Sequence, residues 1–212
     1  MNKRKVIVDF KKRKESNLYK IIELNDLGIK DESTLFYLSE IGLSVIEDNE
    51  YYFFSPFEKL DLFTENCENL VQLGNRFEKN NKSDNLILLS KDTNEIFWYS
   101  KSFFEINLVS HLISKVNNSL ENFLFFQACY INFIEKSLLS SFKPSIKELE
   151  ELFNDFMSKI MLVESEILSP KKEEDYRLFW LNKIMRISYE LEEHYNMFLP
   201  EITKLLPTIN KS

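Results

Sequence analysis

Glycine is scarce in this chain of 212 residues, which contains only Gly28, Gly42 and Gly74. Phosphate-binding loops need several glycines within a few residues, because their backbone must approach the ligand closely. The wide spacing of the three glycines therefore excludes most glycine-dependent nucleotide sites. Nothing else in the sequence indicates a cofactor, so we expect none.

Histidine is scarcer still, with only His111 and His194. A catalytic triad needs a nucleophile, a base and a group that orients them, and no such set is evident. Without a partner motif beside it, His111 is interpreted as a structural or surface residue. Glu190 and His194 have a spacing that can hold a metal on one helix face, but no second pair accompanies them. We predict no metal site and no catalytic residue; a hydrolase using two carboxylates stays open because acidic residues are plentiful.

Cysteine and long apolar runs are also lacking. Cys67 and Cys129 lie far apart in different expected elements, which favours buried free thiols over a disulfide. No apolar run is long enough to span a membrane, and the run at residues 6–8 is too short for a signal peptide. We therefore expect a cytoplasmic protein without a membrane partner. The sequence does not indicate an oligomeric state.

Charge is present in excess of one sign and is unevenly distributed. The net charge is −7, yet residues 1–20 contain eight Lys/Arg and two Asp/Glu, a net charge of +6. The other 192 residues therefore carry −13. An acidic body repels nucleic acid and attracts basic partners over long range, although it also serves solubility alone. The basic N-terminal segment could bind nucleic acid, but an edge strand near residues 6–8, protected by lysines, is the favoured interpretation.

Short strand patterns fill the first half of the chain. Residues 86–99 are predicted to form a hairpin with its turn at residues 92–95. Pro56 is expected to end a preceding strand, and residues 57–68 are expected to form a loop. Residues 103–109 add either a further strand or a loop. The expected strands are at residues 51–54, 70–74, 86–89 and 96–99.

A short helix is predicted between the basic segment and the strands, after a lead at residues 16–24 that is either helical or extended. Asp31 or Ser33 is the expected cap of this helix. Gly42 suits the position just past its C-terminal end. The residues expected to face inward are Leu35, Leu38 and Ile41.

The second half of the chain changes to helical periodicity, with three helices expected. The first begins near Asn118 and Glu121, which resemble a capping box, and the second begins at Ser145 with Glu148 as its box partner. The third begins at residues 169–170. The faces expected to be buried contain Leu120, Leu124, Ala128, Ile131, Ile134 and Leu138 in the first helix, Ile146, Leu149, Phe153, Phe156 and Ile160 in the second, and Tyr176, Trp180, Ile184, Ile187, Leu191 and Tyr195 in the third.

Strands followed by helices predict an α+β fold, with a mainly antiparallel sheet packed against helices. We expect an α+β domain over residues 1–143 and a helical extension over residues 144–212, together forming one structural unit. Trp180 should be buried and dock the third helix onto the rest of the chain.

The candidate partner-binding residues are acids around the early strands and one aromatic residue of the hairpin. They are Glu47, Asp48, Glu50, Asp61, Glu65 and Trp98. Acids around an aromatic anchor suit a basic protein partner. The alternative is that Trp98 belongs to the core and the acids are merely solvated. Strand alternation places Phe97 and Tyr99 on one face of the sheet and Trp98 on the other.

Five short motifs occur in an order that resembles a known family. They are the helix and Gly-Leu turn at residues 34–43, the strand at 70–74 that ends in glycine, the hairpin at 86–97, the helix start at 117–124, and the Trp-bearing helix at 176–180. Their order is similar to that of the SUKH superfamily, and within it to the fourth group of SUKH immunity proteins of bacterial polymorphic toxin systems. Thr93-Asn94 replaces the usual Thr-Gly of the hairpin, and Leu43-Ser44 replaces a common Leu-Pro.

This resemblance implies an α+β fold whose cleft and loops bind and block a toxin domain. Such toxins are commonly nucleases or nucleic-acid deaminases and are often basic, and the family has no agreed catalytic residues. We therefore expect a non-enzymatic bacterial immunity protein with a basic toxin as its partner. The alternative is a non-enzymatic regulatory scaffold or protein-interaction module.

Overall fold

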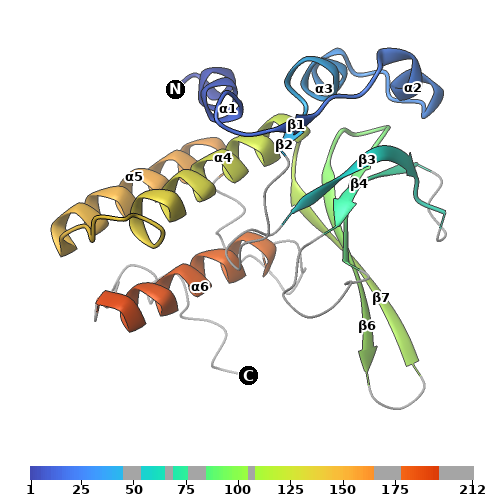
Figure 1. Cartoon of the computed structure of the whole chain (residues 1–212). Coiled ribbons are helices and arrows are strands. Elements are labelled where there is room, and N and C mark those ends of the chain that lie inside the picture. Colours follow the sequence, from blue (N-terminus) through green and yellow to red (C-terminus); the bar gives the residue numbers. More distant parts are fainter. Residues whose placement is uncertain (45–53, 65–68, 76–84, 105–107, 165–177, 196–212) are drawn as a thin grey trace. The chain divides into compact units, whose positions relative to one another are not determined.

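The computed structural model describes residues 1–44, 54–64, 69–75, 85–104, 108–164 and 178–195 (Figure 1). The described residues form six α-helices, a five-stranded antiparallel sheet and a two-stranded sheet. The predicted α+β class is confirmed, with the longer helices in the C-terminal half. The chain divides into two compact units, residues 1–128 and residues 129–212, which are described separately.

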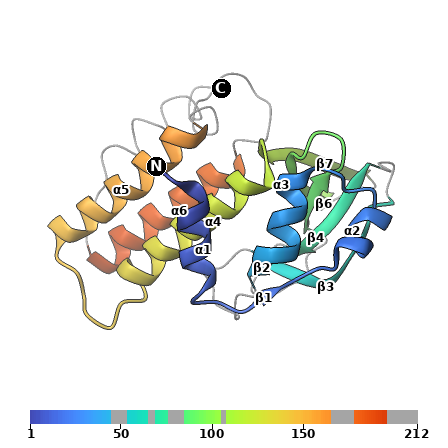
Figure 2. The ribbon, with the colours of Figure 1, turned by 90° about the horizontal axis from the view of Figure 1, so that it is seen from above.

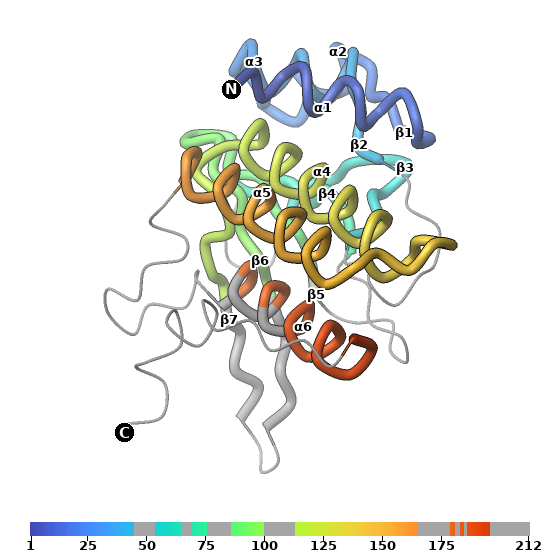
Figure 3. The backbone as a smooth tube through the Cα atoms, turned by 90° about the vertical axis from the view of Figure 1, so that its left-hand side faces the viewer, coloured from blue at the N-terminus to red at the C-terminus, as the bar shows by residue number. Residues whose placement is uncertain are grey.

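The basic N-terminal segment is a helix, α1 (Lys3–Lys11), and the predicted edge strand is wrong (Figure 3). Asn2 caps the helix, since its side-chain oxygen accepts a hydrogen bond from the Lys5 backbone N–H at 3.0 Å. Ile7 and Phe10 lie three residues apart and are both buried. The β-branched residues 6–8 suggested a strand, but this helical spacing of the two buried residues decides the structure.

The lead to the predicted short helix contains both of the forms expected for it. β1 (Ser16–Asn17) is extended and pairs with β2 (Leu43–Ser44), and α2 (Ile21–Asp26) is helical. α3 (Glu32–Phe36) follows and continues into η1 (Tyr37–Ile41), a π-helical turn.

The caps of this helical segment agree with the sequence. The Asp31 carboxylate accepts a hydrogen bond from the Thr34 backbone N–H at 2.7 Å, so Asp31 and not Ser33 is the N-cap. Gly42 ends the segment at φ +76°, in the left-handed region that favours glycine. Of the three residues expected to face inward only Leu38 is fully buried, whereas Leu35 and Ile41 are half-buried.

The five-stranded sheet has the order β3-β4-β5-β6-β7, with every neighbouring pair antiparallel. Its strands are β3 (Ser55–Leu62), β4 (Leu70–Asn75), β5 (Asn85–Ser90), β6 (Ile96–Phe104) and β7 (Leu108–Asn117). The predicted hairpin is confirmed as β5–β6. Its turn contains Asn94 at φ 60°, a conformation that asparagine tolerates.

β3 contradicts the predicted loop and the predicted role of Pro56. Pro56 lies inside β3 and pairs with Gly74 of β4. Proline is tolerated here because β3 is an edge strand of the sheet, so one side of its backbone needs no ladder hydrogen bond. Phe54 precedes β3 and is buried, whereas residues 51–53 of the predicted strand lie outside the described residues.

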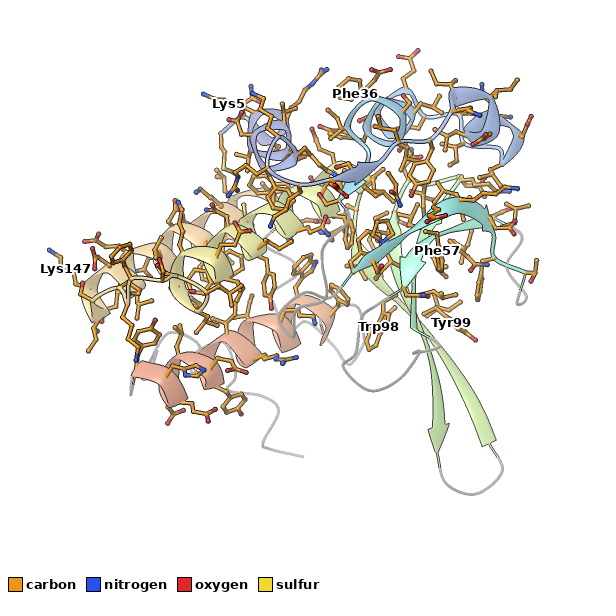
Figure 4. The ribbon with its side chains drawn as sticks, viewed as in Figure 1. Lys5, Phe36, Phe57, Trp98, Tyr99 and Lys147 are labelled. Carbon is orange, nitrogen blue, oxygen red and sulfur yellow. The ribbon has the colours of Figure 1, made fainter. Side chains whose placement is uncertain are left out.

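The two faces of the sheet follow the predicted alternation. Leu86 pairs with Tyr99, and Leu88 pairs with Phe97. These side chains share a face and form a cluster with Phe63 and Leu70. Trp98 pairs with Ile87 and points to the other face; its side chain and that of Tyr99 leave β6 on opposite sides (Figure 4).

α4 (Leu120–Ser137) begins next to α1 and contributes its first half to the first unit. Its cap is Ser119, whose hydroxyl accepts a hydrogen bond from the Asn122 backbone N–H at 3.2 Å. The Glu121 carboxylate, expected to take part in a capping box with Asn118, lies 2.7 Å from the Lys3 ammonium and accepts a hydrogen bond from the Tyr37 hydroxyl at 2.6 Å.

The second unit is helical and aromatic in its core. α5 (Ile146–Glu164) and α6 (Leu178–Tyr195) pack with the second half of α4. The Tyr130 ring centroid lies 6.5 Å from that of Trp180 and 6.4 Å from that of Phe156. Trp180 is fully buried, which confirms that the third predicted helix docks. The predicted faces of α5 and α6 are buried except for Ile146, which is 53% exposed, and Tyr195, which is half-buried; Tyr176 and the predicted start of the third helix at residues 169–170 lie outside the described residues.

Candidate functional site

The structure describes two of the six predicted binding residues. Glu47, Asp48, Glu50 and Glu65 lie outside the described residues. Asp61 is exposed in β3, and Trp98 is half-buried in β6.

These two residues are not brought together. The strand register runs from Asp61 to Gln72, then to Leu88 and Phe97, so Asp61 belongs to the face of Phe97. Trp98 points to the opposite face, and two strands separate β3 from β6. The described acid therefore does not surround the predicted aromatic anchor.

Asp61 instead lines a groove between α2 and β3, with a volume of about 270 Å³. In Figures 1 and 2 these two elements lie side by side. The groove is defined here by its charged residues Glu23, Asp26, Lys59 and Asp61, its apolar residues Leu24, Leu27 and Leu60, and Tyr19. We call it the α2–β3 groove.

Local structure explains why these residues meet. Leu24 and Leu60 are buried and anchor α2 and β3 to the core. Lys59 and Asp61 are exposed residues of β3 next to the register shift between Pro56 and Asp61, and both line the groove. Glu23 and Asp26 are three residues apart in α2 and are therefore neighbours on the helix surface.

Tyr19 ties the segment before α2 to β3. Its hydroxyl donates a hydrogen bond to the Phe57 carbonyl at 2.5 Å, and the Asn17 side-chain amide donates to the same carbonyl at 3.2 Å. Burial raises the pKa of Tyr19 to about 12, an effect that the hydrogen bond with Asn17 partly opposes. The phenol therefore stays protonated and remains a donor at neutral pH.

Sequence reasoning missed Glu23 and Asp26. The available signal was the sequence of α2 itself, in which the apolar pair Ile21-Ile22 precedes two acids within one short helix. Ile21 is 50% and Ile22 is 67% exposed, which a purely structural helix of this size does not require.

A second polar cluster joins α1, η1 and α4. The Lys3 ammonium lies 2.7 Å from a Glu121 carboxylate oxygen and donates to the Asn122 side-chain oxygen at 2.8 Å. The Tyr37 hydroxyl donates to Glu121 at 2.6 Å. The Arg4 guanidinium stacks over the Phe36 ring, with 3.9 Å from its carbon to the ring centroid. Two of the N-terminal basic residues are thus engaged within the fold.

The contacts in this cluster shift the pKa of the Glu121 carboxyl and of the Tyr37 hydroxyl. Burial opposes ionisation of Glu121, but hydrogen bonds from Lys3 and Tyr37 and the charges of Lys3 and Arg4 hold its pKa below the ordinary value. Burial, and then the bond to the Glu121 carboxylate, raise the pKa of Tyr37. Both residues keep the protonation states that their hydrogen bond requires, which suits a structural tie.

The remaining candidate groups do not assemble a reactive centre among the described residues. His194 Nε2 lies 3.5 Å from a Glu190 carboxylate oxygen, but no group of three His, Cys, Asp or Glu side chains in the described segments is placed to hold a metal. Cys129 is buried, and burial raises the pKa of its thiol to about 12. Cys67 and the His111 side chain lie outside what the structure describes.

Comparisons with family models, with curated proteins and with solved structures give no match to this chain. None of the described helices combines the length and the apolar character that crossing a membrane requires.

Proposed function

We propose that this protein is a cytoplasmic immunity protein that binds a basic bacterial toxin domain and covers its active site. The toxin is a nuclease or a nucleic-acid deaminase, and the protein itself makes and breaks no bonds. The observation that carries the proposal is the charge of −13 on residues 21–212. The similarity of five ordered motifs to the SUKH immunity proteins supports the same function.

The chemistry of inhibition follows from charge. An enzyme that acts on nucleic acid presents a basic groove to its substrate, because it must neutralise phosphates. An acidic protein is steered toward that groove and competes with the substrate for it. The engagement of Lys3 with Glu121, and of Arg4 with Phe36, supports this reading, because these cations stabilise the fold itself.

The proposal is tested with the protein domain encoded by the reading frame next to that of this chain. We expect a stoichiometric complex whose association rate falls about tenfold or more between 50 and 300 mM salt. Charge reversal at Glu47, Asp48 and Glu50 to lysine should slow association further. The absence of any complex with the neighbouring toxin domain would contradict the proposal.

A further inference from the structure

We propose that the α2–β3 groove is the docking face for the partner, and that its occupant is a protein segment bearing a lysine or arginine flanked by apolar side chains. This inference rests on the proposed function, since it assigns that function a place on the molecule. Two independent observations carry it: the chemistry inside the groove and the apolar surface at its rim.

The size of the groove selects the class of occupant. Sites for cofactors and drug-sized molecules usually occupy about 300–1,000 Å³. At about 270 Å³ the α2–β3 groove lies just below that range and fits one or two side chains of a partner. Because it is open to the surface, a segment of a larger protein can reach it without unfolding.

The charges inside the groove select a cation. Glu23, Asp26 and Asp61 supply three carboxylates, whereas Lys59 supplies one ammonium. Lys20 lies 3.5 Å from Glu23, but both side chains are largely exposed, so this pair is weak and exchangeable. The same acids repel nucleic acid, because phosphates carry the same sign.

The apolar part of the groove selects a long cation with a hydrocarbon stem. Leu24, Leu27 and Leu60 line it beside the carboxylates. Lysine and arginine pack their methylene groups on apolar surface and keep the charged end in a polar environment. An arginine would add two parallel hydrogen bonds to one carboxylate.

Three large apolar side chains, next in sequence to the groove residues Tyr19 and Glu23, are exposed, and we call them the rim of the groove. Leu18 is 60%, Ile21 is 50% and Ile22 is 67% exposed, all within five residues. Ile22 precedes Asp26 by four residues, so the two share a face of α2. Apolar contacts around a charged centre exclude water from it, which is the arrangement found around binding hot spots.

The experiment uses the full-length chain and the neighbouring toxin domain, and compares two sets of isosteric variants that remove the same charge. The groove set is Glu23→Gln, Asp26→Asn and Asp61→Asn, and the control set is Glu150→Gln, Glu192→Gln and Glu193→Gln on exposed positions of α5 and α6. We expect the groove set to weaken binding by about tenfold or more and the control set to change it less than about twofold.

A second variant, Ile22→Ser, removes rim contact without changing charge. It should weaken binding by about fivefold or more at both low and high salt, because its contribution is apolar. The Asp61→Asn substitution keeps a side-chain oxygen that can accept the hydrogen bond from the Leu62 backbone N–H, 2.8 Å long in the wild type. Unchanged circular dichroism of every variant establishes that its fold is intact.

The outcomes separate the two proposals. Equal binding by all variants would overturn the groove assignment and leave the immunity function standing. A dimer of this chain that dissociates in the groove set would assign the groove to a second copy, and would also overturn it. If the toxin domain does not bind at all, the immunity function fails.

If the toxin domain does not bind, a model peptide tests whether the α2–β3 groove binds a basic and apolar segment. An octapeptide of alternating leucine and lysine, titrated into the isotope-labelled chain, should shift backbone amide resonances of residues 18–27 and 57–62. Loss of these shifts in the groove set would support the assignment. Shifts elsewhere, or none, would overturn it.

Discussion

At the scale of single residues, Glu121 is a charged side chain that takes part in contacts within the fold. Its carboxylate accepts from Lys3 and Tyr37 and joins three elements of the first unit. From sequence alone Glu121 was assigned to a capping box, because the spacing to Asn118 fits one. The structure shows two long-range partners for this carboxylate, Lys3 and Tyr37, which the local spacing does not reveal.

Replacing Glu121 by Gln should reduce the pH dependence of stability. The folded-state pKa of Glu121 lies below the ordinary glutamate value of about 4.3. Its contribution is therefore present above about pH 4.3 and is lost as the pH falls through the lower folded-state value. Because the side chain is partly exposed, we expect a loss of about 1 kcal/mol or less at pH 7.

Urea unfolding of the wild type and of Glu121→Gln at pH 7, 5 and 3 measures this effect. The difference between the two proteins should shrink toward pH 3. Glu150→Gln, which removes an exposed charge on α5, is the matched control and should leave the wild-type profile unchanged. A constant difference at all three pH values would contradict the role given to Glu121.

Gly74 is required by the close approach of two strands. A Cβ at this position would lie 2.2 Å from the Ser55 carbonyl oxygen and 2.8 Å from the Pro56 Cα, both backbone atoms that cannot rotate away. We expect Gly74→Ala to lower the free energy of unfolding by about 2–3 kcal/mol.

The matched comparison is Gly28→Ala. There the new Cβ would meet only the Lys91 side chain at 3.4 Å, and the cost comes from the positive φ of 86°. It should be about 1 kcal/mol. Chemical denaturation of both variants tests the order, and a larger loss for Gly28→Ala would show that β3 and β4 do not approach as described.

The thiol of Cys129 should be inert in the folded protein. Burial raises its pKa to about 12, an effect that the charge of Lys159 opposes and the charge of Asp155 supports, so little thiolate forms at pH 8. In a Cys67→Ser variant, we expect the remaining thiol to react with a disulfide reagent about 100-fold more slowly in buffer than in urea. Equal rates would show that Cys129 is accessible.

At the scale of elements, local capping signals were read correctly where the partner is close in sequence. Ser145 and Glu148 form the predicted capping box of α5: the Ser145 backbone N–H donates to Glu148 at 2.7 Å, and the Glu148 backbone N–H donates to the Ser145 hydroxyl at 3.3 Å. Asp31 caps α3 through one such bond, which its carboxylate accepts from the Thr34 backbone N–H. Such signals are reliable because they depend on residues three apart and not on the rest of the fold.

Ser145→Ala should destabilise the first turn of α5. The variant loses the hydroxyl that accepts from the Glu148 N–H, at a cost of about 1 kcal/mol. Hydrogen exchange of the first-turn amides of α5 should accelerate, while amides of the β5–β6 hairpin should not. Ser158→Ala, within α5, is the control and should leave exchange in the first turn unchanged. Unaltered exchange at the start of α5 in Ser145→Ala would contradict the capping role.

Elements whose form depends on tertiary position were misread. The run at residues 6–8 has strand propensity, but Ile7 and Phe10 are buried together only in a helix. Proline usually ends a central strand, but Pro56 lies in β3, which is at the edge of the sheet, where proline is allowed. Neither outcome can be read from a local pattern, because each depends on where the segment lies in the finished sheet or core.

At the scale of the whole molecule, the α+β class and the three long helices followed from periodicity. The predicted binding residues did not form one described site. A cluster of acids in the sequence does not show on which face of the sheet each carboxylate lies. The register of β3 to β6 places Asp61 on one face of the sheet and Trp98 on the other. The α2–β3 groove escaped prediction because its acids come from two segments that only the fold brings together.

If the protein is an immunity protein, as we propose, the most direct measurement of its function is inhibition of the toxin domain expected from the neighbouring reading frame. The toxin's activity on its nucleic-acid substrate is recorded while this chain is added in increasing amounts. If the protein acts by covering its partner, activity falls linearly and reaches zero at one equivalent. Unaffected activity at several equivalents, or complete loss at a small fraction of one equivalent, would contradict a stoichiometric blocking role.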